Sequence, residues 1–283
     1  MSNKVWFITG ASRGMGRVWA EAALKRGDKV AATARKAADV ADLAETFGDA
    51  ALPLALEPTD AAQVRAAVEQ AHAHFGRLDV VLNNAAYPLV GTIEEASEED
   101  VQAQFNTNVF GPHRVIKAAL PLLRKQGHGH IIGVSSTLGV ITMPLIGFYC
   151  SSKWALEAMH ESLAMEVRSF GIKVSIIEPG AYATEFGGPQ SGKRSQEIEV
   201  YGDVRKQVFA GMQTMERGDP KATAEAVLKL VDAEHPPLRL MLGAHGLPQT
   251  KHVYAERIAT WDAWKDVADA AQGVSVRMSD SSK

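Results

Sequence analysis

Tyr149 and Lys153 are the residues whose types and spacing first suggest chemistry. Residues four apart on a helix lie on one face, so a phenol and an ammonium at these positions are neighbours. A phenol with a pKa of about 10 is mostly protonated at neutral pH, and a nearby ammonium lowers that pKa. Such a tyrosine can exchange a proton with an alcohol or a ketone. Surface helix contacts have the same spacing, so the rest of the chain must decide.

Ser136 lies thirteen residues before Tyr149, after the apolar run 130–134, which predicts a buried strand. Its hydroxyl is expected to reach the same substrate oxygen as the Tyr149 phenol. His128 and His130 have no cysteine or acidic cluster beside them in the sequence, so we predict no metal site there. Cys150 has no base placed for it and is predicted to be a small buried residue rather than a nucleophile.

A glycine-rich segment, Thr-Gly-Ala-Ser-Arg-Gly-Met-Gly, spans residues 9–16, between a short apolar run and a helical pattern. Glycines let the backbone approach a pyrophosphate, while amide groups at the helix N-terminus face the anion. The spacing is Gly-x-x-x-Gly-x-Gly, not the commoner Gly-x-Gly-x-x-Gly. A plain tight turn would have similar glycines, but the position between a strand and a helix favours nucleotide binding.

Apolar runs alternate with helical patterns along most of the chain. We expect strands at residues 4–9, 29–34, 51–56, 79–82, 130–134, 173–177 and 238–242. Helices are expected at residues 37–47, 60–75, 98–123 with a break near Gly111 and Pro112, 149–170 and 220–233. This alternation predicts a doubly wound parallel sheet of Rossmann type, with helices on both faces and a single domain over residues 1–283. The motifs above fall at the carboxyl ends of strands, where such sheets bind ligands.

Two segments depart from the alternation. Residues 185–218 form an irregular insertion in which a short amphipathic helix is expected, and a lid over the site would lie there. An inert surface excursion fits the same pattern. Residues 248–272 form a C-terminal tail with apolar residues at helical intervals, which predicts a helix.

The composition is that of a globular protein: 283 residues, 46% hydrophobic and 22% charged. A net charge of −3 gives no reason to expect nucleic acid or an anionic membrane as a partner. Cys150 is the only cysteine, which fits a reducing compartment. No uncharged run approaches the roughly 20 residues of a spanning helix, and the first apolar run is too short for a signal peptide. We therefore expect a soluble, cytoplasmic protein.

From about Val5 to Leu242 the chain resembles the short-chain dehydrogenase/reductases of ordinary length. The motifs that carry the resemblance are residues 9–16, Asn-Asn-Ala at 83–85, Asn108 in Asn-Val-Phe-Gly, Ser136, Tyr149-x-x-x-Lys153, and Pro179-Gly180 followed by Thr184. Residues 149–157 and 176–180 are similar to the subgroup of hydroxysteroid and retinol dehydrogenases and bacterial carbonyl reductases.

The resemblance implies a role for each matching residue of the reaction site. Tyr149 would be the acid/base, and Lys153 would lower the pKa of Tyr149 and hold the nicotinamide ribose. Ser136 would hold the substrate oxygen, and Asn108 would support a proton relay through water.

Cofactor contacts are implied in the same way. Thr9 and Asn83 would fix the loops around the cofactor, Ala85 would lie near the adenosine ribose, and Thr184 near the carboxamide. The other predicted cofactor-binding residues are Gly10, Ser12, Arg13, Gly14, Met15, Gly16, Arg35, Glu57, Lys153, Pro179 and Gly180. Two departures from the family pattern are Ala86 in place of Gly, and Glu57-Pro58 in place of Asp-Val, which leaves the adenine contact of Glu57 open.

The second strand ends in Ala34 and Arg35, where an NAD enzyme typically has an acidic residue on the ribose hydroxyls. Arg13, in the glycine turn, is expected on the other side of the same ribose. Two guanidinium groups around a 2′-phosphate predict NADP(H) rather than NAD(H). The alternative is that both arginines are solvated surface residues.

Together these features predict an oxidoreductase that transfers a hydride between NADP(H) and a ketone, aldehyde or secondary alcohol. The predicted substrate pocket is largely apolar and favours a bulky hydrophobic substrate; its residues are Tyr87, Leu138, Met143, Tyr182, Phe186 and Phe209. The alternatives are an NAD-dependent alcohol or hydroxysteroid dehydrogenase, and a catalytically silent nucleotide-binding regulatory protein. The resemblance also implies a homodimer or homotetramer.

Overall fold

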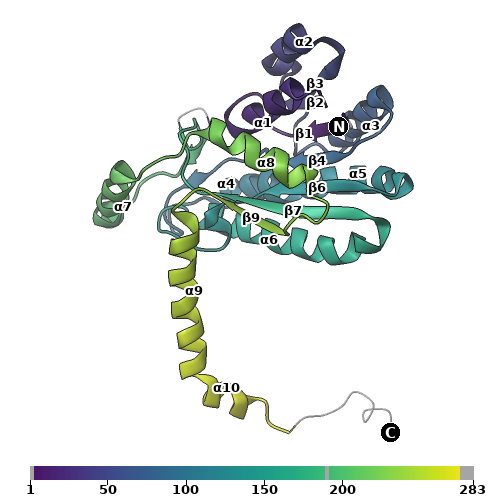
Figure 1. Ribbon diagram of the computed structural model, residues 1–283. Coiled ribbons are helices and arrows are strands. Elements are labelled where there is room, and N and C mark those ends of the chain that lie inside the picture. Colours follow the sequence, from purple (N-terminus) through teal and green to yellow (C-terminus); the bar gives the residue numbers. More distant parts are fainter. Residues whose placement is uncertain (1–2, 189–190, 275–283) are drawn as a thin grey trace. The chain divides into compact units, whose positions relative to one another are not determined.

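The computed structural model describes residues 3–188 and 191–274 of the chain. The chain divides into two compact units, Met1–Gly243 and Ala244–Lys283. The first unit contains a seven-stranded parallel sheet of order β3-β2-β1-β4-β6-β7-β9 (Figure 1). The prediction of a doubly wound parallel sheet is therefore confirmed.

The strands of this sheet are β1 (Val5–Ile8), β2 (Lys29–Ala34), β3 (Ala51–Ala55), β4 (Val80–Asn83), β6 (Gly129–Val134), β7 (Ile172–Pro179) and β9 (Arg239–Leu242). The helices that connect them are α1 (Gly14–Lys25), α2 (Ala41–Phe47), α3 (Ala61–Phe75), α4 (Glu98–Phe105), α5 (Gly111–Gln126), α6 (Gly147–Val167) and α8 (Thr223–Asp232). Every strand predicted from the apolar runs is present, with ends that differ by at most three residues.

Side chains that alternate along the strands fill a separate core on each face of the sheet. Trp6 and Ile8 of β1 belong to one core, together with residues of α1, α2 and α8. Phe7, between them, belongs to the other core with residues of α3, α5 and α6. The strand order reverses between β1 and β4, and ligands of open parallel sheets bind at the carboxyl edge beside such a reversal.

The long helix predicted at residues 98–123 is interrupted by one π-helical turn. It consists of α4, the π-helix η3 (Asn106–Phe110) and α5. The break therefore comes just before Gly111 and Pro112, which are the first residues of α5. A proline is tolerated there because its missing N–H would be unpaired in a first turn anyway.

One strand of the insertion belongs to a small two-stranded sheet that the sequence did not predict. β5 (Leu89–Val90) pairs in parallel with β8 (Lys193–Arg194), and the expected amphipathic helix is α7 (Gly202–Thr214). Pro189 and Gln190, which belong to the predicted lid, lie outside the described residues.

The second unit contains two helices, α9 (Gly246–Ala263) and α10 (Lys265–Ala271), as the periodicity of the tail predicted. Across residues 3–188 and 191–274, no helix combines the length and the hydropathy needed to cross a membrane.

Candidate functional site

The glycine-rich turn after β1 is tied to the end of β4 by two side chains. Thr9 Oγ1 accepts hydrogen bonds from the backbone N–H groups of Asn84 at 2.9 Å and Ala85 at 3.0 Å. In return, Asn84 Nδ2 donates to the carbonyl oxygens of Thr9 and Gly10, each at 3.0 Å. Thr9 therefore fixes these loops, as predicted, but its partner is Asn84.

Asn83, which was predicted to share this role, does not make these contacts. It is the last residue of β4 and is 2% exposed, and neither Oδ1 nor Nδ2 has a hydrogen-bond partner among the described residues. Successive side chains of a strand point to opposite sides, so only one of two adjacent asparagines can reach the glycine turn. Asn84 takes that place.

The conformation of the turn depends on its three glycines. Gly10 and Gly14 have φ angles of +68° and +58°, which residues other than glycine rarely adopt. A Cβ on Gly16 would collide with Asn84 Nδ2 and the Gly10 carbonyl oxygen. By contrast, a Cβ on Gly14 would meet only the Thr184 side chain, at 4.0 Å. Open space therefore lies beside Gly14 at the start of α1, and the N-termini of helices are positions at which proteins can bind anions.

Two basic residues, Arg13 and Arg35, lie near the carboxyl ends of β1 and β2. The end of β2 carries no acidic residue. Ala34 is buried and Arg35 is exposed directly after the strand. Arg13, before α1, forms an ion pair with Glu185 of the insertion at 3.6 Å. The Glu57 carboxylate accepts hydrogen bonds from the N–H of Thr59 at 3.1 Å and from its hydroxyl at 2.9 Å. Glu57 thus stabilises its own turn, and Arg13 is paired with Glu185.

Tyr149 and Lys153 are neighbours on the first turns of α6, and both are buried, with 5% and 2% of their surface exposed. Lys153 Nζ lies 5.7 Å from the centroid of the Tyr149 ring. The same Nζ donates a hydrogen bond to the carbonyl oxygen of Val134, at the end of β6, at 2.7 Å. The spacing predicted from the sequence therefore brings the two groups together at the carboxyl edge of the sheet.

Burial dominates the proton affinities of this pair. It raises the pKa of the Tyr149 phenol above its usual value, against a hydrogen bond with Ser136, which lowers it. It lowers the pKa of Lys153 to about 8, against the charge of Glu157, which raises it. Desolvation of the phenolate outweighs the lowering of the Tyr149 pKa that was expected from Lys153, whose ammonium is directed to the Val134 carbonyl.

Ser136 follows β6 and faces both the phenol and the end of β7. Its hydroxyl accepts a hydrogen bond from the N–H of Leu138 at 3.1 Å and donates to the carbonyl oxygen of Pro179 at 3.4 Å. The N–H of Gly180 donates to Leu242, at the end of β9, at 3.0 Å. Hydrogen bonds therefore connect Ser136, Pro179 and Gly180, which were predicted as site residues, across the carboxyl ends of β6, β7 and β9.

Asn108 lies in the π-helical turn and is fully buried. Its Nδ2 donates to the carbonyl oxygen of Tyr87 at 2.9 Å and to Ser152 Oγ at 3.1 Å, and its Oδ1 accepts from the N–H of Tyr87 at 3.1 Å. Gln104 Nε2 donates to the same Tyr87 carbonyl at 3.1 Å. The side chain of Asn108 thus positions the loop after β4 against α6. The extra residue of a π-helical turn is common at functional sites.

Of the predicted substrate residues, Phe186 lies directly beside Tyr149. Its ring centroid lies 5.5 Å from that of Tyr149, and the side chain is 46% exposed. Tyr182 instead packs its ring against Gly218, where an added Cβ would lie 2.7 Å from the ring, and so closes the base of the insertion. The remaining members are half-buried: Tyr87, Leu138, Met143 and Phe209.

An ion pair between Arg205 and Glu95, which was not predicted from the sequence, connects the insertion to the loop after β5. Arg205 of α7 contacts the buried Glu95 carboxylate at 2.8 Å, and Glu95 also accepts from the N–H groups of Ile198 at 2.7 Å and Thr92 at 2.8 Å. The hydrogen bond from Arg205 lowers the pKa of Glu95 to about 2. No spacing in the sequence points to this pair, because its members are 110 residues apart.

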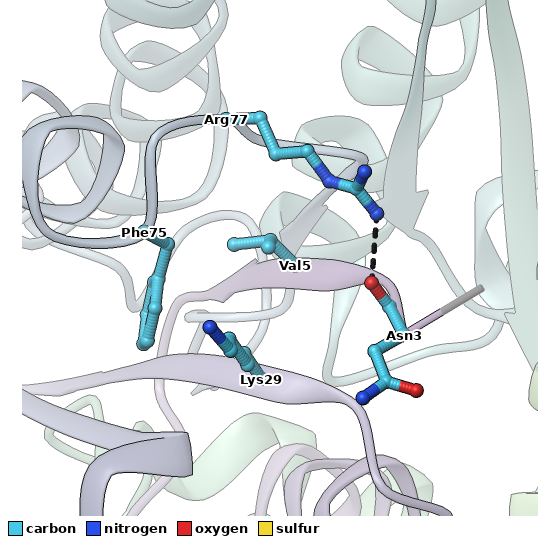
Figure 2. A pocket seen from close by; sticks show the side chains of 5 residues that line it. All are labelled: Asn3, Val5, Lys29, Phe75 and Arg77. Atoms are coloured by element: carbon cyan, nitrogen blue, oxygen red, sulfur yellow. Dashed lines mark hydrogen bonds between the residues drawn. The ribbon is translucent and has the colours of Figure 1, made fainter.

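A pocket lined by polar and apolar residues lies at the other edge of the sheet (Figure 2). Val5 and Lys29 begin β1 and β2, so this pocket is at the amino ends of the strands. Ligands of parallel sheets bind at the opposite ends. The lining residues are Asn3, Val5, Lys29, Phe75 and Arg77.

The histidines considered as metal ligands have other partners. His130 Nε2 lies 2.9 Å from Ser175 Oγ, and His128 Nε2 lies 3.3 Å from Asp79 Oδ1. Within the described ranges, no group of three or more His, Cys, Asp or Glu residues is arranged to hold a metal ion.

Comparison with known proteins agrees with this geometry. A family model described as short chain dehydrogenase matches residues 4–195. The chain belongs to the short-chain dehydrogenase family. Oxidoreductase BOA17 of Botryotinia fuckeliana is 38% identical over 95% of this chain and 99% of its own length. A 3-ketodihydrosphingosine reductase of Bacteroides thetaiotaomicron is 37% identical over 86% of this chain and 89% of its own.

A crystal structure of a short-chain dehydrogenase from Streptomyces avermitilis superimposes with a TM-score of 0.87 at 36% identity. The superposition covers 95% of this chain and 98% of the chain from Streptomyces avermitilis. Both the family resemblance and the fold expected from the sequence are therefore confirmed.

Proposed function

We propose that this oxidoreductase transfers a hydride between NADP(H) and a ketone, aldehyde or secondary alcohol, with Tyr149 as acid/base. The observation that carries the proposal is the buried pair of Tyr149 and Lys153, with Ser136 hydrogen-bonded to the phenol, at the carboxyl edge of the sheet. A phenol beside a second hydroxyl and an ammonium is a suitable proton donor to a carbonyl oxygen.

When bound, the nicotinamide cofactor supplies or accepts the hydride. The Ser136 and Tyr149 hydroxyls donate hydrogen bonds to the substrate oxygen. As a ketone becomes an alcohol, Tyr149 gives its proton to that oxygen, and the charge of Lys153 stabilises the phenolate that forms. Burial keeps the free phenol protonated, which is the form that a proton donor needs. The proton relay through Asn108 stays a prediction, as its side chain is occupied in holding Tyr87.

The preference for NADP(H) rests on charge. No carboxylate follows β2, and the exposed guanidinium of Arg35 stands where the ribose of a nucleotide would be bound. Arg13 is the second cation of the proposal, although its ion pair with Glu185 competes for it. An NAD-dependent alcohol or hydroxysteroid dehydrogenase is the alternative within the same chemistry.

The substrate class follows from the apolar surroundings of Tyr149. Phe186, beside the phenol and half-exposed, offers a hydrophobic wall to a substrate. The relative from Bacteroides thetaiotaomicron is named for a long-chain amino ketone, which fits the same kind of wall. We therefore propose a bulky, hydrophobic ketone as the substrate and reduction as the direction. A homodimer or homotetramer, a cytoplasmic location, and closure of residues 185–218 as a lid stay predictions from the sequence.

The test is the reduction of a panel of ketones of increasing chain length. The rate is measured from the nicotinamide absorbance, with NADPH and with NADH. Tyr149→Phe is expected to bind the cofactor normally while turnover falls at least about a hundredfold, the low end of general acid/base contributions. Tyr254→Phe, on α9, is the matched control and keeps wild-type turnover. A Tyr149→Phe enzyme within threefold of wild type would disprove the assignment. Wild-type protein that binds NADPH yet reduces none of the ketones would favour the silent regulatory alternative.

A further inference from the structure

Lys153 holds its ammonium where burial disfavours a charge. Its Nζ has the Val134 carbonyl as a hydrogen-bond acceptor, but a carbonyl is a dipole and supplies no counter-charge. The titratable or charged side chains on α6 and on the strands beneath it, β7 and β9, include Tyr149, Glu157, His160, Glu161, Glu178 and Arg239. Burial lowers the pKa of His160 to about 4, so this imidazole is neutral near pH 7.

Glu157 follows Lys153 by one turn of α6, so the two side chains lie on the same face. The Glu157 side chain is 6% exposed, and its Oε2 accepts a hydrogen bond from Arg239 Nε at 3.0 Å. The same Nε lies 3.5 Å from Glu178 Oε1, whose side chain is 3% exposed. The other arm of the guanidinium donates to Glu161 Oε2 at 2.8 Å. Arg239 therefore contacts two buried carboxyl groups, those of Glu157 and Glu178.

The two buried carboxyl groups bind protons as a coupled pair. Burial raises the pKa of both, and the neighbouring Glu157 carboxylate helps to raise the pKa of Glu178 to about 7. Arg239 and the Ser135 hydroxyl favour the ionised form of Glu157. Arg239 Nε lies 3.0 Å from Glu157 Oε2 and 3.5 Å from Glu178 Oε1, so the guanidinium favours a negative charge on Glu157, one turn from Lys153. The Glu157 charge favours the ammonium form of Lys153.

We propose that Glu157 is a positioning residue of this enzyme, whose carboxylate, held by Arg239, keeps Lys153 in its charged form beside Tyr149. The inference rests on the proposed function, because it assigns Glu157 a task in the proton transfer by Tyr149. Glu157 does not touch the substrate and acts only through Lys153. Its effect therefore belongs in the pH dependence of the reaction and in the titration of Lys153.

Glu157→Gln keeps the size of the side chain and removes its charge. A unit charge one helical turn away shifts a pKa by on the order of one unit at an effective dielectric constant of about 20. Loss of a negative neighbour disfavours the ammonium, so the titration midpoint of Lys153 is expected to fall by on the order of one unit. Reduction requires charged Lys153, so the alkaline limb of the kcat/KM profile is expected to move to lower pH by the same amount.

Glu161→Gln is the matched control, because it makes the same substitution and removes another ion pair of the same Arg239. Glu161 is half-exposed and one turn further from Lys153, so its loss is expected to leave both the midpoint and the alkaline limb in place. Glu157→Asp retains the charge and is expected to restore most of the wild-type profile. A merely structural role for Glu157 would lower stability without moving either quantity.

The midpoint is measured without turnover, from the ¹³Cε chemical shift of Lys153 in lysine-labelled protein, assigned by its loss in Lys153→Arg. Equal midpoints in wild type and Glu157→Gln, or an equal fall in Glu161→Gln, would overturn the inference. If the midpoint falls as expected but wild type reduces no ketone, the proposed function fails while the link between Glu157 and Lys153 stands.

A reciprocal measurement remains decisive if Glu157→Gln does not fold. Linkage requires that Lys153 and the carboxyl pair influence each other equally. Lys153→Met is therefore expected to raise the titration midpoint of the pair, followed by the ¹³Cδ shifts of Glu157 and Glu178, by on the order of one unit. An unchanged midpoint would refute the coupling.

Discussion

Replacement of Thr9 by valine tests whether the cofactor loops are held in place before any cofactor binds. Valine has nearly the shape of threonine but cannot accept the hydrogen bonds that Oγ1 receives from Asn84 and Ala85. Thr9 is 3% exposed, so the valine methyl group would be buried as the threonine side chain is. The change therefore removes two backbone hydrogen bonds while leaving the packing nearly intact.

The expected loss of stability follows from these two N–H groups. An unpaired buried donor costs about 1–3 kcal/mol, so two donors cost about 2–6 kcal/mol. Asn84 and Ala85 are only half-buried, and water partly replaces the lost acceptor. We therefore expect Thr9→Val to lower the free energy of unfolding by about 2–3 kcal/mol. Thr9→Ser keeps the acceptor and loses one methyl group, which costs about 0.5–1.5 kcal/mol.

Urea unfolding gives the comparison, provided that the dependence of the free energy on urea is the same for all variants. The affinity for NADPH, measured by fluorescence, should also weaken by about tenfold in Thr9→Val, because the loops must then be ordered when the cofactor binds. In Thr9→Ser it should stay near that of wild type. If the valine variant is no less stable than the serine variant, the loops are not held by Oγ1 and the reasoning fails.

Two further predictions concern charge and pH. Arg35→Ala should weaken NADPH binding by at least about tenfold while NADH binding is unchanged, and Ala34→Asp should reverse the preference; wild-type kcat/KM that is equal or better with NADH would contradict this. Burial lowers the pKa of His130 from 6.5 to about 3 and that of His160 to about 4. These two histidines therefore bind more protons in the unfolded chain than in the folded chain below pH 6.5, and their contribution to the free energy of unfolding should fall as pH drops from about 6.5 to about 4. His130→Gln should flatten this dependence in urea titrations at several pH values, and an unchanged slope would exclude the role of His130.

Most of the fold could be predicted from the sequence because the signals that specify it are local. A buried strand of a parallel sheet is a short apolar run, and β1, β4 and β6 are such runs. Once these strands are parallel, the residues that follow them must meet at one edge. This reasoning placed Thr9, Ser136 and the Tyr149–Lys153 pair at that edge, and in the structure Thr9 follows β1, Ser136 follows β6, and Lys153 contacts the end of β6.

What could not be predicted depends on contacts between distant segments. Nothing in the Asn-Asn-Ala motif says which asparagine faces the glycine turn; that depends on the residue at which β4 ends. The π-helical turn at Asn108 is likewise stabilised by Tyr87 and Ser152, which are remote in sequence. The pairing of Arg205 with Glu95 requires the small sheet of β5 and β8, whose strands are only two residues each.

The sequence also contains a regular spacing of charged residues along α6 from which no prediction was made. The spacing of four that relates Tyr149 to Lys153 continues to Glu157 and Glu161, so all four residues follow one face of α6. The first three are buried against the sheet, and Glu161 is half-exposed. A carboxylate one turn beyond a catalytic lysine is expected to influence its charge, but the sequence could not show that Glu178 and Arg239 meet Glu157 there. Only the order β6-β7-β9 brings them beneath the helix. The helix that carries the proposed acid/base therefore also carries the charge that we expect to control it.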